Sequence, residues 1–412
     1  MAESANASIA SFRTRLAAIR RIRGFIPRRD SSAFAQGLAS LLEGLAAEVS
    51  DPRTGVELVA AFYETDDAIF NHCDDSNGRI GDVFRYDVRD LFVHYASRCE
   101  DKAWLGSLLL RLNRNDGFGL RDHLFGCAAD YLPEATMRVL IGSLWELADQ
   151  ETNEFQQRHW LRGIESLASQ LKDAPLFERA RRASWPTLGT AACVDIAAVY
   201  LESGDPATAL SWLERIPESE TFQEDERDQL LLAVHGRLGN RQQQEAVAWR
   251  IFRRYRSEDT LGTLLSVIGE EQRERVIDDE ARVILRFEEL SYSDAAFLVS
   301  SGRKETAETY LLARTDQFDG YFYECLLPLA ENMEEDGRYL VASVIYRALL
   351  ESILRRTQSK YYHHGVRYLR KLAALASKID TWRTVLPHGA YVNELRRVHA
   401  RKMSFWSRYS EE

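Results

Sequence analysis

Basic and aromatic side chains alternate near the end of the chain, and their types fit a binding chemistry. Arginine and lysine can neutralise phosphates or carboxylates, while aromatic rings can stack on bases. We predict that the contacts come from two segments, residues 361–372 and 390–409, through Arg367, Arg370, Lys371, Arg396, Arg397, His399, Arg401, Lys402, Phe405 and Trp406. The simpler interpretation is a capping helix whose aromatic pair closes the core, with the basic surface left for an acidic partner.

No short motif of a known enzyme class accompanies these residues. The chain lacks the GxSxG, GxxxxGK[ST], GxGxxG and HExxH patterns, which hold a nucleophile, a phosphate, a dinucleotide and a zinc ion. We therefore predict a protein that is not an enzyme and that needs no cofactor. A hydrolase or nuclease that uses scattered carboxylates and a metal ion stays open as an alternative.

The polar run Asp74–Asp82 partly matches a calcium-binding loop. With Gly78 at the sixth position of such a loop, Cys73 takes the first position and Phe84 the twelfth, so the closing bidentate glutamate is missing. We predict a turn between helices with Asp or Ser caps, and no metal. The late histidines also lack zinc-ligand spacing, because no i,i+4 pair or adjacent cysteine pair accompanies His363, His364, His388 and His399.

The sequence contains a repeated helical pattern, and these helices must position the C-terminal basic residues. Three segments align in one register: Ala197, Tyr200, Gly204, Ala209 and Leu213; Ala295, Leu298, Gly302, Ala307 and Leu311; and Ala330, Met333, Gly337, Ala342 and Tyr346. Each pattern predicts two helices, in which the glycine ends the first and the small residues allow close approach of the second. The spacings of 98 and 35 residues are close to multiples of the roughly 34-residue tetratricopeptide period.

The remaining sequence also reads as helical, since no segment shows the alternation of a strand. We predict an all-α protein, a right-handed α-solenoid of tetratricopeptide-like helix pairs with an irregular helical N-terminal part. The expected parts are a basic amphipathic helix within residues 1–30, an irregular helical region at 31–185, and repeats with a basic capping helix at 186–408. The first helix, Ser8–Ile26, is expected to pack on the body with its arginines toward solvent or toward the acidic middle of the chain, although a transit peptide or a membrane-surface helix has the same pattern.

Charge is strongly segregated along the chain. Residues 4–29 hold seven arginines and no acid, and residues 355–408 carry a net charge of +11, whereas residues 30–354 carry −25. No apolar run is long enough to span a membrane, and the five cysteines are dispersed and never form a CxxC pair. These features predict a cytoplasmic protein whose cysteines are reduced.

The segments His364–Leu369 and His399–Trp406, with Tyr391-Val392 and Leu395-Arg396 between them, resemble the C-terminal signature of an uncharacterised bacterial family of tetratricopeptide-like proteins. The run Asp74–Val83 also resembles a segment of that family. The resemblance implies a bacterial helical-repeat protein and brings no known activity. The same signature occurs behind SWIM-type zinc fingers, but this chain lacks their CxC and CxH pairs, so zinc-dependent DNA contact does not carry over.

Together these patterns predict a non-enzymatic scaffold that binds a peptide or protein partner in the repeat groove. Trp212, Trp249, Tyr310, Tyr321 and Tyr323 are candidate anchors if they face that groove. The alternative is a nucleic-acid-binding protein that uses the basic C-terminal helices, with binding that weakens steeply as salt rises.

Overall fold

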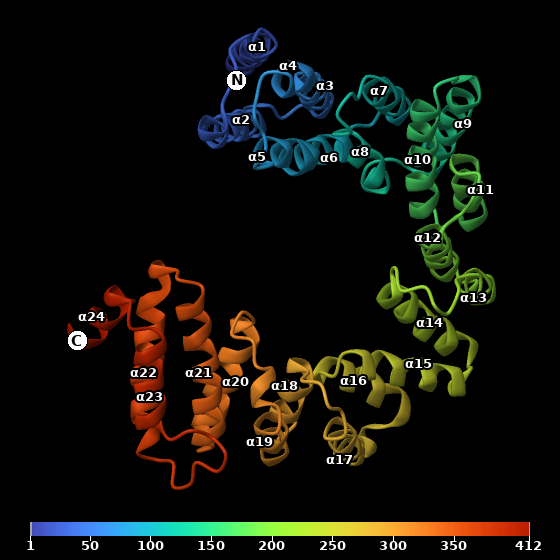
Figure 1. Cartoon of the computed structure of the whole chain (residues 1–412). Helices are drawn as coiled ribbons and strands as arrows, with labels where there is room; N and C mark the ends of the chain where they lie inside the picture. Colours follow the sequence, from blue (N-terminus) through green and yellow to red (C-terminus); the bar gives the residue numbers. More distant parts are fainter. Residues whose placement is uncertain (1, 412) are drawn as a thin grey trace. The chain divides into compact units, whose positions relative to one another are not determined.

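The computed structural model describes the backbone of residues 2–411 and the side chains of residue 7 and of residues 9–410. Within this range the chain is helical and contains no strand; a single bridge joins Ile26 to Cys73. The prediction of an all-α protein is therefore confirmed (Figure 1). Contacts divide the chain into two compact units, Met1–Leu230 and Leu231–Glu412.

The first unit is built from short and medium helices in chain order. They are α1 (Ala2–Ile19), α2 (Arg28–Glu48), α3 (Pro52–Tyr63), α4 (Asp66–Phe70), α5 (Arg79–Asp82), α6 (Arg89–Arg98), α7 (Lys102–Arg114), α8 (Asp122–Gly126), α9 (Glu134–Gln150), α10 (Glu154–Gln170), α11 (Ala174–Ser184), α12 (Thr190–Glu202), α13 (Pro206–Leu213) and the start of α14 (Glu224–Leu238). A π-helical turn, Val83–Val88, joins α5 to α6, and a 3-10 turn, Ala128–Asp130, follows α8.

Aspartate caps begin several of these helices. The side chains of Asp51, Asp101, Asp173 and Asp205 each accept a hydrogen bond from a backbone N–H in the first turn of the following helix. Pro52 stands at the first position of α3, where its missing N–H costs nothing.

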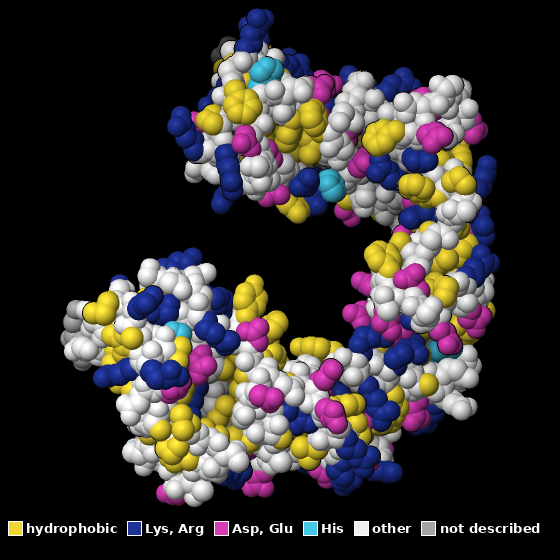
Figure 2. Space-filling view, in the orientation of Figure 1, with side chains coloured by type: hydrophobic (Ala, Val, Ile, Leu, Met, Phe, Trp, Pro, Cys, Tyr) yellow, Lys and Arg dark blue, Asp and Glu magenta, His cyan; other side chains and the backbone are white. Residues whose placement is uncertain are grey.

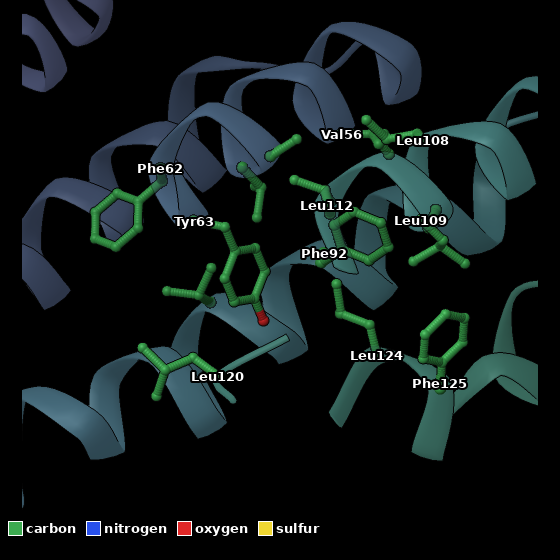
Figure 3. Packing of buried hydrophobic residues seen from close by; sticks show 14 of the residues in the cluster. Val56, Phe62, Tyr63, Phe92, Leu108, Leu109, Leu112, Leu120, Leu124 and Phe125 are labelled. Carbon is green, nitrogen blue, oxygen red and sulfur yellow. The ribbon is translucent and has the colours of Figure 1, made fainter. Parts of the chain in front are cut away.

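Helices α3, α6, α7 and α8 enclose much of the core of the first unit. Their buried side chains meet in one cluster, in which the rings of Tyr63 and Phe92 lie 6.5 Å apart (Figure 3). Gly55 of α3 permits close packing, because a Cβ atom there would lie only 2.3 Å from the ring of Tyr95. The hydroxyl of Tyr95 donates to the carbonyls of Leu45 and Val49, which ties α6 to the end of α2.

The N-terminal helix ends earlier than the sequence predicted. α1 stops at Ile19 and is followed by a turn. Further on, the N–H of Ile26 donates to the His72 carbonyl at 2.8 Å, and the Ile26 carbonyl accepts from Asp74 N–H at 2.9 Å. The expected helix to residue 26 is therefore wrong over its last turns. Phe12 and Leu16 of α1 are buried against the unit.

The second unit continues the helical order. Its elements are the rest of α14, α15 (Arg241–Arg254), α16 (Glu258–Ile268), α17 (Arg273–Ile284), α18 (Tyr292–Ser300), α19 (Lys304–Leu312), α20 (Tyr323–Glu335), α21 (Tyr339–Arg355), α22 (Tyr362–Ala376), α23 (His388–Val398) and α24 (Met403–Glu411), with short 3-10 turns before α17, α20 and α22. α18 packs on α19 and α20, and α21 packs on α19, α20 and α22.

The glycines of the repeat pattern end helices as predicted. Gly204, Gly302 and Gly337 follow α12, α18 and α20 with φ of 91°, 77° and 76°, a left-handed conformation that favours glycine. Behind Gly302, the N–H of Arg303 donates back to the Leu298 carbonyl at 2.8 Å. The alanines of the pattern are all fully buried: Ala197, Ala209, Ala295, Ala307, Ala330 and Ala342. The helix–glycine–helix unit is confirmed at all three places.

The C-terminal helix expected over residues 390–409 is wrong as a single element. The chain forms α23 and α24, separated by a turn in which the N–H of Lys402 donates to the His399 carbonyl. No proline or glycine marks this break in the sequence. Its consequence is that Arg401 and Lys402 lie in a connection between helices, not on a helix face.

Candidate interaction surface of the C-terminal helices

A basic depression lies on the exposed side of α22. The helix turns Tyr362, Gly365, Leu369 and Leu372 into the core, so the positions between them face away from it. The depression has a volume of about 500 Å³ and is lined by His363, Val366, Arg367, Arg370, Lys371, Ala374 and Arg408. No carboxylate is among these residues. The structure therefore brings together the predicted residues Arg367, Arg370 and Lys371 and adds Arg408 from α24.

Only some of these cations are tied to acidic partners. Lys371 Nζ donates to the Glu334 carboxylate of α20 at 2.5 Å, and the Tyr346 hydroxyl donates to the same carboxylate at 2.9 Å. Among the described residues, Arg367 and Arg408 form no ion pair, and Arg367 lies over the ring of Tyr368 at 5.5 Å. Their charges are thus available to an anionic ligand.

Two histidines lie at the edge of the depression, and the nearby cations affect the pKa of one of them. The rings of His363 and His364 lie 4.0 Å apart. Burial lowers the pKa of His364, and the neighbouring His363 and Arg367 lower it further. A neutral His364 beside Arg367 is the expected state near neutral pH.

The second predicted group, on α23 and the following turn, is more engaged in local contacts. Arg397 pairs with Glu394 at 2.5 Å, and the Arg396 guanidinium lies 5.3 Å from the ring centroid of Trp406. Lys402 Nζ donates to Thr357 Oγ1 at 3.0 Å. Burial and the charge of Lys402 lower the pKa of His399. Arg401 is exposed.

Phe405 and Trp406 serve packing. Phe405 is 0% exposed and meets the Tyr362 ring edge-on at 5.7 Å. Trp406 Nε1 donates to the His399 carbonyl at 3.0 Å, which closes the turn between α23 and α24. Phe405 cannot stack on a ligand without α24 leaving α22, whereas Trp406 is half-buried.

An exposed aromatic cluster lies at the starts of α20 and α22, and hydrophobic side chains project from this end of α20 in Figure 2. Tyr321, Phe322, Tyr323 and Tyr361 are 63%, 49%, 54% and 41% exposed. Arg356 lies over the Tyr321 ring at 5.0 Å, and Lys360 lies over the Tyr361 ring at 4.7 Å. Cationic and aromatic side chains are therefore combined here.

A glycine places this aromatic run. A Cβ atom on Gly320 would lie 2.3 Å from the Ala348 carbonyl oxygen, so only glycine lets the chain pass this close to α21 before α20 begins. Of the five aromatic anchors named from the sequence, Tyr321 and Tyr323 are exposed, Trp249 is half-buried, and Trp212 and Tyr310 are buried in the core. The unbroken run of three aromatic residues after a glycine was the sequence signal for this cluster.

The Asp74–Asp82 run forms a capped turn. Both carboxylate oxygens of Asp75 accept backbone hydrogen bonds, from Ile80 at 2.9 Å and from Gly81 at 2.8 Å, and Asp74 accepts one from Ser76 at 3.0 Å. These bonds fix the start of α5. Among the described residues no group of three His, Cys, Asp or Glu side chains could hold a metal ion.

None of the described helices combines the length and the apolar composition that crossing a bilayer requires.

Neither a curated protein nor a solved structure matches the chain. A family of unknown function, DUF6880, matches residues 1–191 and residues 187–408. Because these two matches together span nearly the whole sequence, the chain belongs to the DUF6880 family of unknown function.

Proposed function

We propose that the protein is a non-enzymatic interaction scaffold that binds an acidic segment of a protein partner at the basic depression of α22 and α24. The observation that carries this proposal is the lining of that depression, where cationic side chains converge without a carboxylate and Arg367 and Arg408 have no ion-pair partner among the described residues. An acidic peptide supplies the missing charge, and the apolar floor at Val366 suits a small hydrophobic side chain.

The scaffold in this proposal is a right-handed solenoid of tetratricopeptide-like pairs over residues 186–408, behind an irregular helical region at 31–185. Support comes from the packing order of two successive helix pairs in the second unit, α18 with α19 and α20 with α21. The first helices of the two pairs contact each other, and so do the second helices. Stacked pairs of this kind present one continuous face to a ligand. The handedness is the one expected of tetratricopeptide repeats.

The proposed groove extends beyond the depression, because neighbouring rings connect the depression to the exposed aromatic cluster. His363 lines the depression, its ring lies beside His364, and the Tyr361 ring lies 6.4 Å from His364. Tyr361 belongs to the exposed aromatic cluster. A bound peptide can thus place acidic side chains near Arg367 and apolar or aromatic side chains on the cluster.

The proposed setting is the cytoplasm of a bacterial cell. It rests on the family resemblance and on the five cysteines, all of which are free in the structure. We also propose that the chain is related to proteins that carry SWIM modules.

Binding of a fluorescently labelled, glutamate-rich dodecapeptide to the purified chain tests the scaffold proposal by anisotropy. The double variant Arg367→Glu/Arg408→Glu should weaken binding by about tenfold or more, since two attractive contacts become repulsive. Arg286→Glu, an exposed arginine of the same unit without an ion pair among the described residues, is the matched control. Equal binding by both variants would contradict the proposal.

A second candidate function, single-stranded nucleic-acid binding, is favoured by one observation, the exposed rings of Tyr321, Phe322, Tyr323 and Tyr361 beside Arg356 and Lys360. A labelled oligonucleotide should then bind more weakly as salt rises. Charge reversal at Arg396, Arg397, Arg401 and Lys402 should abolish that binding, and Tyr321→Ala/Tyr323→Ala should reduce it. Phe155→Ala, an exposed ring of the first unit, controls for nonspecific stacking. Binding that survives both changes rules this function out.

A further inference from the structure

Helix α21 buries an arginine that forms no ion pair with a carboxylate among the described residues. Arg347 is only 7% exposed, yet its Nε and Nη2 atoms make no hydrogen bond. Its guanidinium lies 4.2 Å from the ring centroid of Tyr391 and 5.1 Å from that of Trp382. Aromatic faces stabilise the cation but offer no acceptor to its in-plane N–H groups. The pKa of Arg347 is lowered by this burial.

Two more polar groups close to Arg347 have no geometric hydrogen bond within the described part of the chain. His388 Nδ1 and the Tyr391 hydroxyl are buried without a hydrogen bond. Both belong to the first turn of α23, which begins after Pro387 without a side-chain cap. The first turn of an eleven-residue helix has free N–H groups and a partial positive charge. Arg347 lies against the Tyr391 ring, and its charge lowers the pKa of His388, so these three side chains and the N-terminus of α23 lie close together.

We propose that Arg347, His388 and Tyr391 form a binding site for a small oxyanion, a phosphate or carboxylate group, at the N-terminus of α23. The planar guanidinium matches two oxygens of such a group, and the hydroxyl and imidazole can donate to the others. A buried water could satisfy some of these donors, but it would leave the charge of Arg347 uncompensated. Trp382 covers the position from the segment that joins α22 to α23.

Glu351, one turn further along α21, is the internal alternative to an external anion. Its charge contributes to the raised pKa of Tyr391, after burial. The Glu351 charge also acts on Arg347, and the Tyr391 hydroxyl interacts with the Glu351 carboxylate, although neither Arg347 Nη2 nor that hydroxyl meets hydrogen-bond geometry. If the site takes an anion, Glu351 repels it and sets its affinity.

Thermal unfolding of the full chain tests the site, with sodium phosphate and sodium acetate compared against sodium chloride at equal ionic strength. Phosphate or acetate should raise the Tm of the wild type by about 2–4 °C at saturating concentration. The two salts tell a phosphate site from a carboxylate site. Arg347→Met should lose the rise, and so should Tyr391→Phe, which keeps the ring against Arg347 and removes only the hydroxyl.

Matched controls separate this site from the basic depression. Tyr368→Phe removes the hydroxyl of a buried tyrosine of the same unit, and Arg367→Met removes a cation of the depression; both should keep the anion-dependent rise. A wild type that shows no rise in either salt would overturn the proposal. A rise that persists in both Arg347→Met and Tyr391→Phe would overturn it as well.

Removing the Glu351 charge gives an independent readout. Glu351→Gln should bind phosphate about threefold more tightly in calorimetric titration, because a nearby like charge is gone. If Glu351 is instead the partner of Arg347, the Tm of Glu351→Gln in sodium chloride will fall below that of the wild type. The wild type will then bind neither phosphate nor acetate. This pair of results would contradict the proposal.

Discussion

Gly365 of α22 lies directly against the ring of Phe405 of α24. A Cβ atom at Gly365 would come within 3.1 Å of Phe405 Cε2 and 3.3 Å of Leu350 Cδ1. Phe405 is completely buried in this contact. The missing side chain at residue 365 therefore fixes where α24 docks, and with it the position of Arg408 at the basic depression.

Gly365→Val should destabilise the second unit by about 1–3 kcal/mol, because the added methyl groups push Phe405 out of its place. Urea unfolding followed by circular dichroism measures the change. The control is Gly262→Ala in the interior of α16, where a Cβ atom meets nothing within 4 Å; it should stabilise by about 0.5–1 kcal/mol through helix propensity. A Gly365→Val variant with wild-type stability would refute the docking argument.

Gly302→Ala should cost about 1–2 kcal/mol for a purely conformational reason. The residue has a φ of 77°, and a Cβ atom there would meet nothing within 4 Å, so the cost comes from the left-handed backbone alone. The same Gly→Ala change thus has opposite signs at residues 302 and 262. Unfolding curves of the two variants that shift in the same direction would contradict this account.

Glu280 is the centre of a buried ion-pair network in the second unit. It is 1% exposed and accepts from Arg253 at 2.7 Å and from Arg256 at 2.8 Å, while Arg256 also pairs with Asp294 at 2.9 Å. Glu280→Gln should cost about 3–5 kcal/mol, because it leaves Arg256 buried with less compensation. Glu270→Gln, which removes an exposed partner of Arg273, should change stability little.

Three histidines of the second unit should make its stability fall on mild acidification. Burial is the first cause of the lowered pKa of His364, His388 and His399. Below about pH 6.5 the unfolded chain binds protons that the folded chain does not, so the free energy of unfolding decreases as the pH drops towards the folded pKa values. Urea midpoints from pH 7.5 to 5 in phosphate-free buffer measure this slope.

The triple variant His364→Gln/His388→Gln/His399→Gln should have a shallower slope over the same range. A slope identical to that of the wild type would assign the acid sensitivity to other groups. His388→Gln alone also reports on the α23 site, since it removes the imidazole next to Arg347.

The repeat units could be predicted from sequence because their signals are local. An alanine, a glycine seven residues later and a second alanine five residues after that are read within one segment, and the structure buries both alanines around Gly204, Gly302 and Gly337. The basic depression was predicted in part for the same reason, since Arg367, Arg370 and Lys371 share one helix.

Features that depend on distant segments could not be predicted. The break between α23 and α24 has no proline or glycine, and it is set by Phe405 docking on Gly365 forty residues away. Arg408 joins the depression only through that docking. In the sequence, Arg347 is an ordinary cation within an apolar run. Its lack of a hydrogen-bond partner depends on the side chains that α23 and the preceding segment place around it.

The neighbour-to-neighbour packing of the second unit has a kinetic consequence. The main contacts of α18 to α22 join helices that are adjacent or next but one in the chain, so only short loops must close during folding. We expect folding that is fast for a unit of this size, and opening that begins at the end. In hydrogen exchange, the amides of α23 and α24 should therefore exchange well before those of α20 and α21, and this opening would remove Arg408 from the basic depression and the N-terminus of α23 from Arg347.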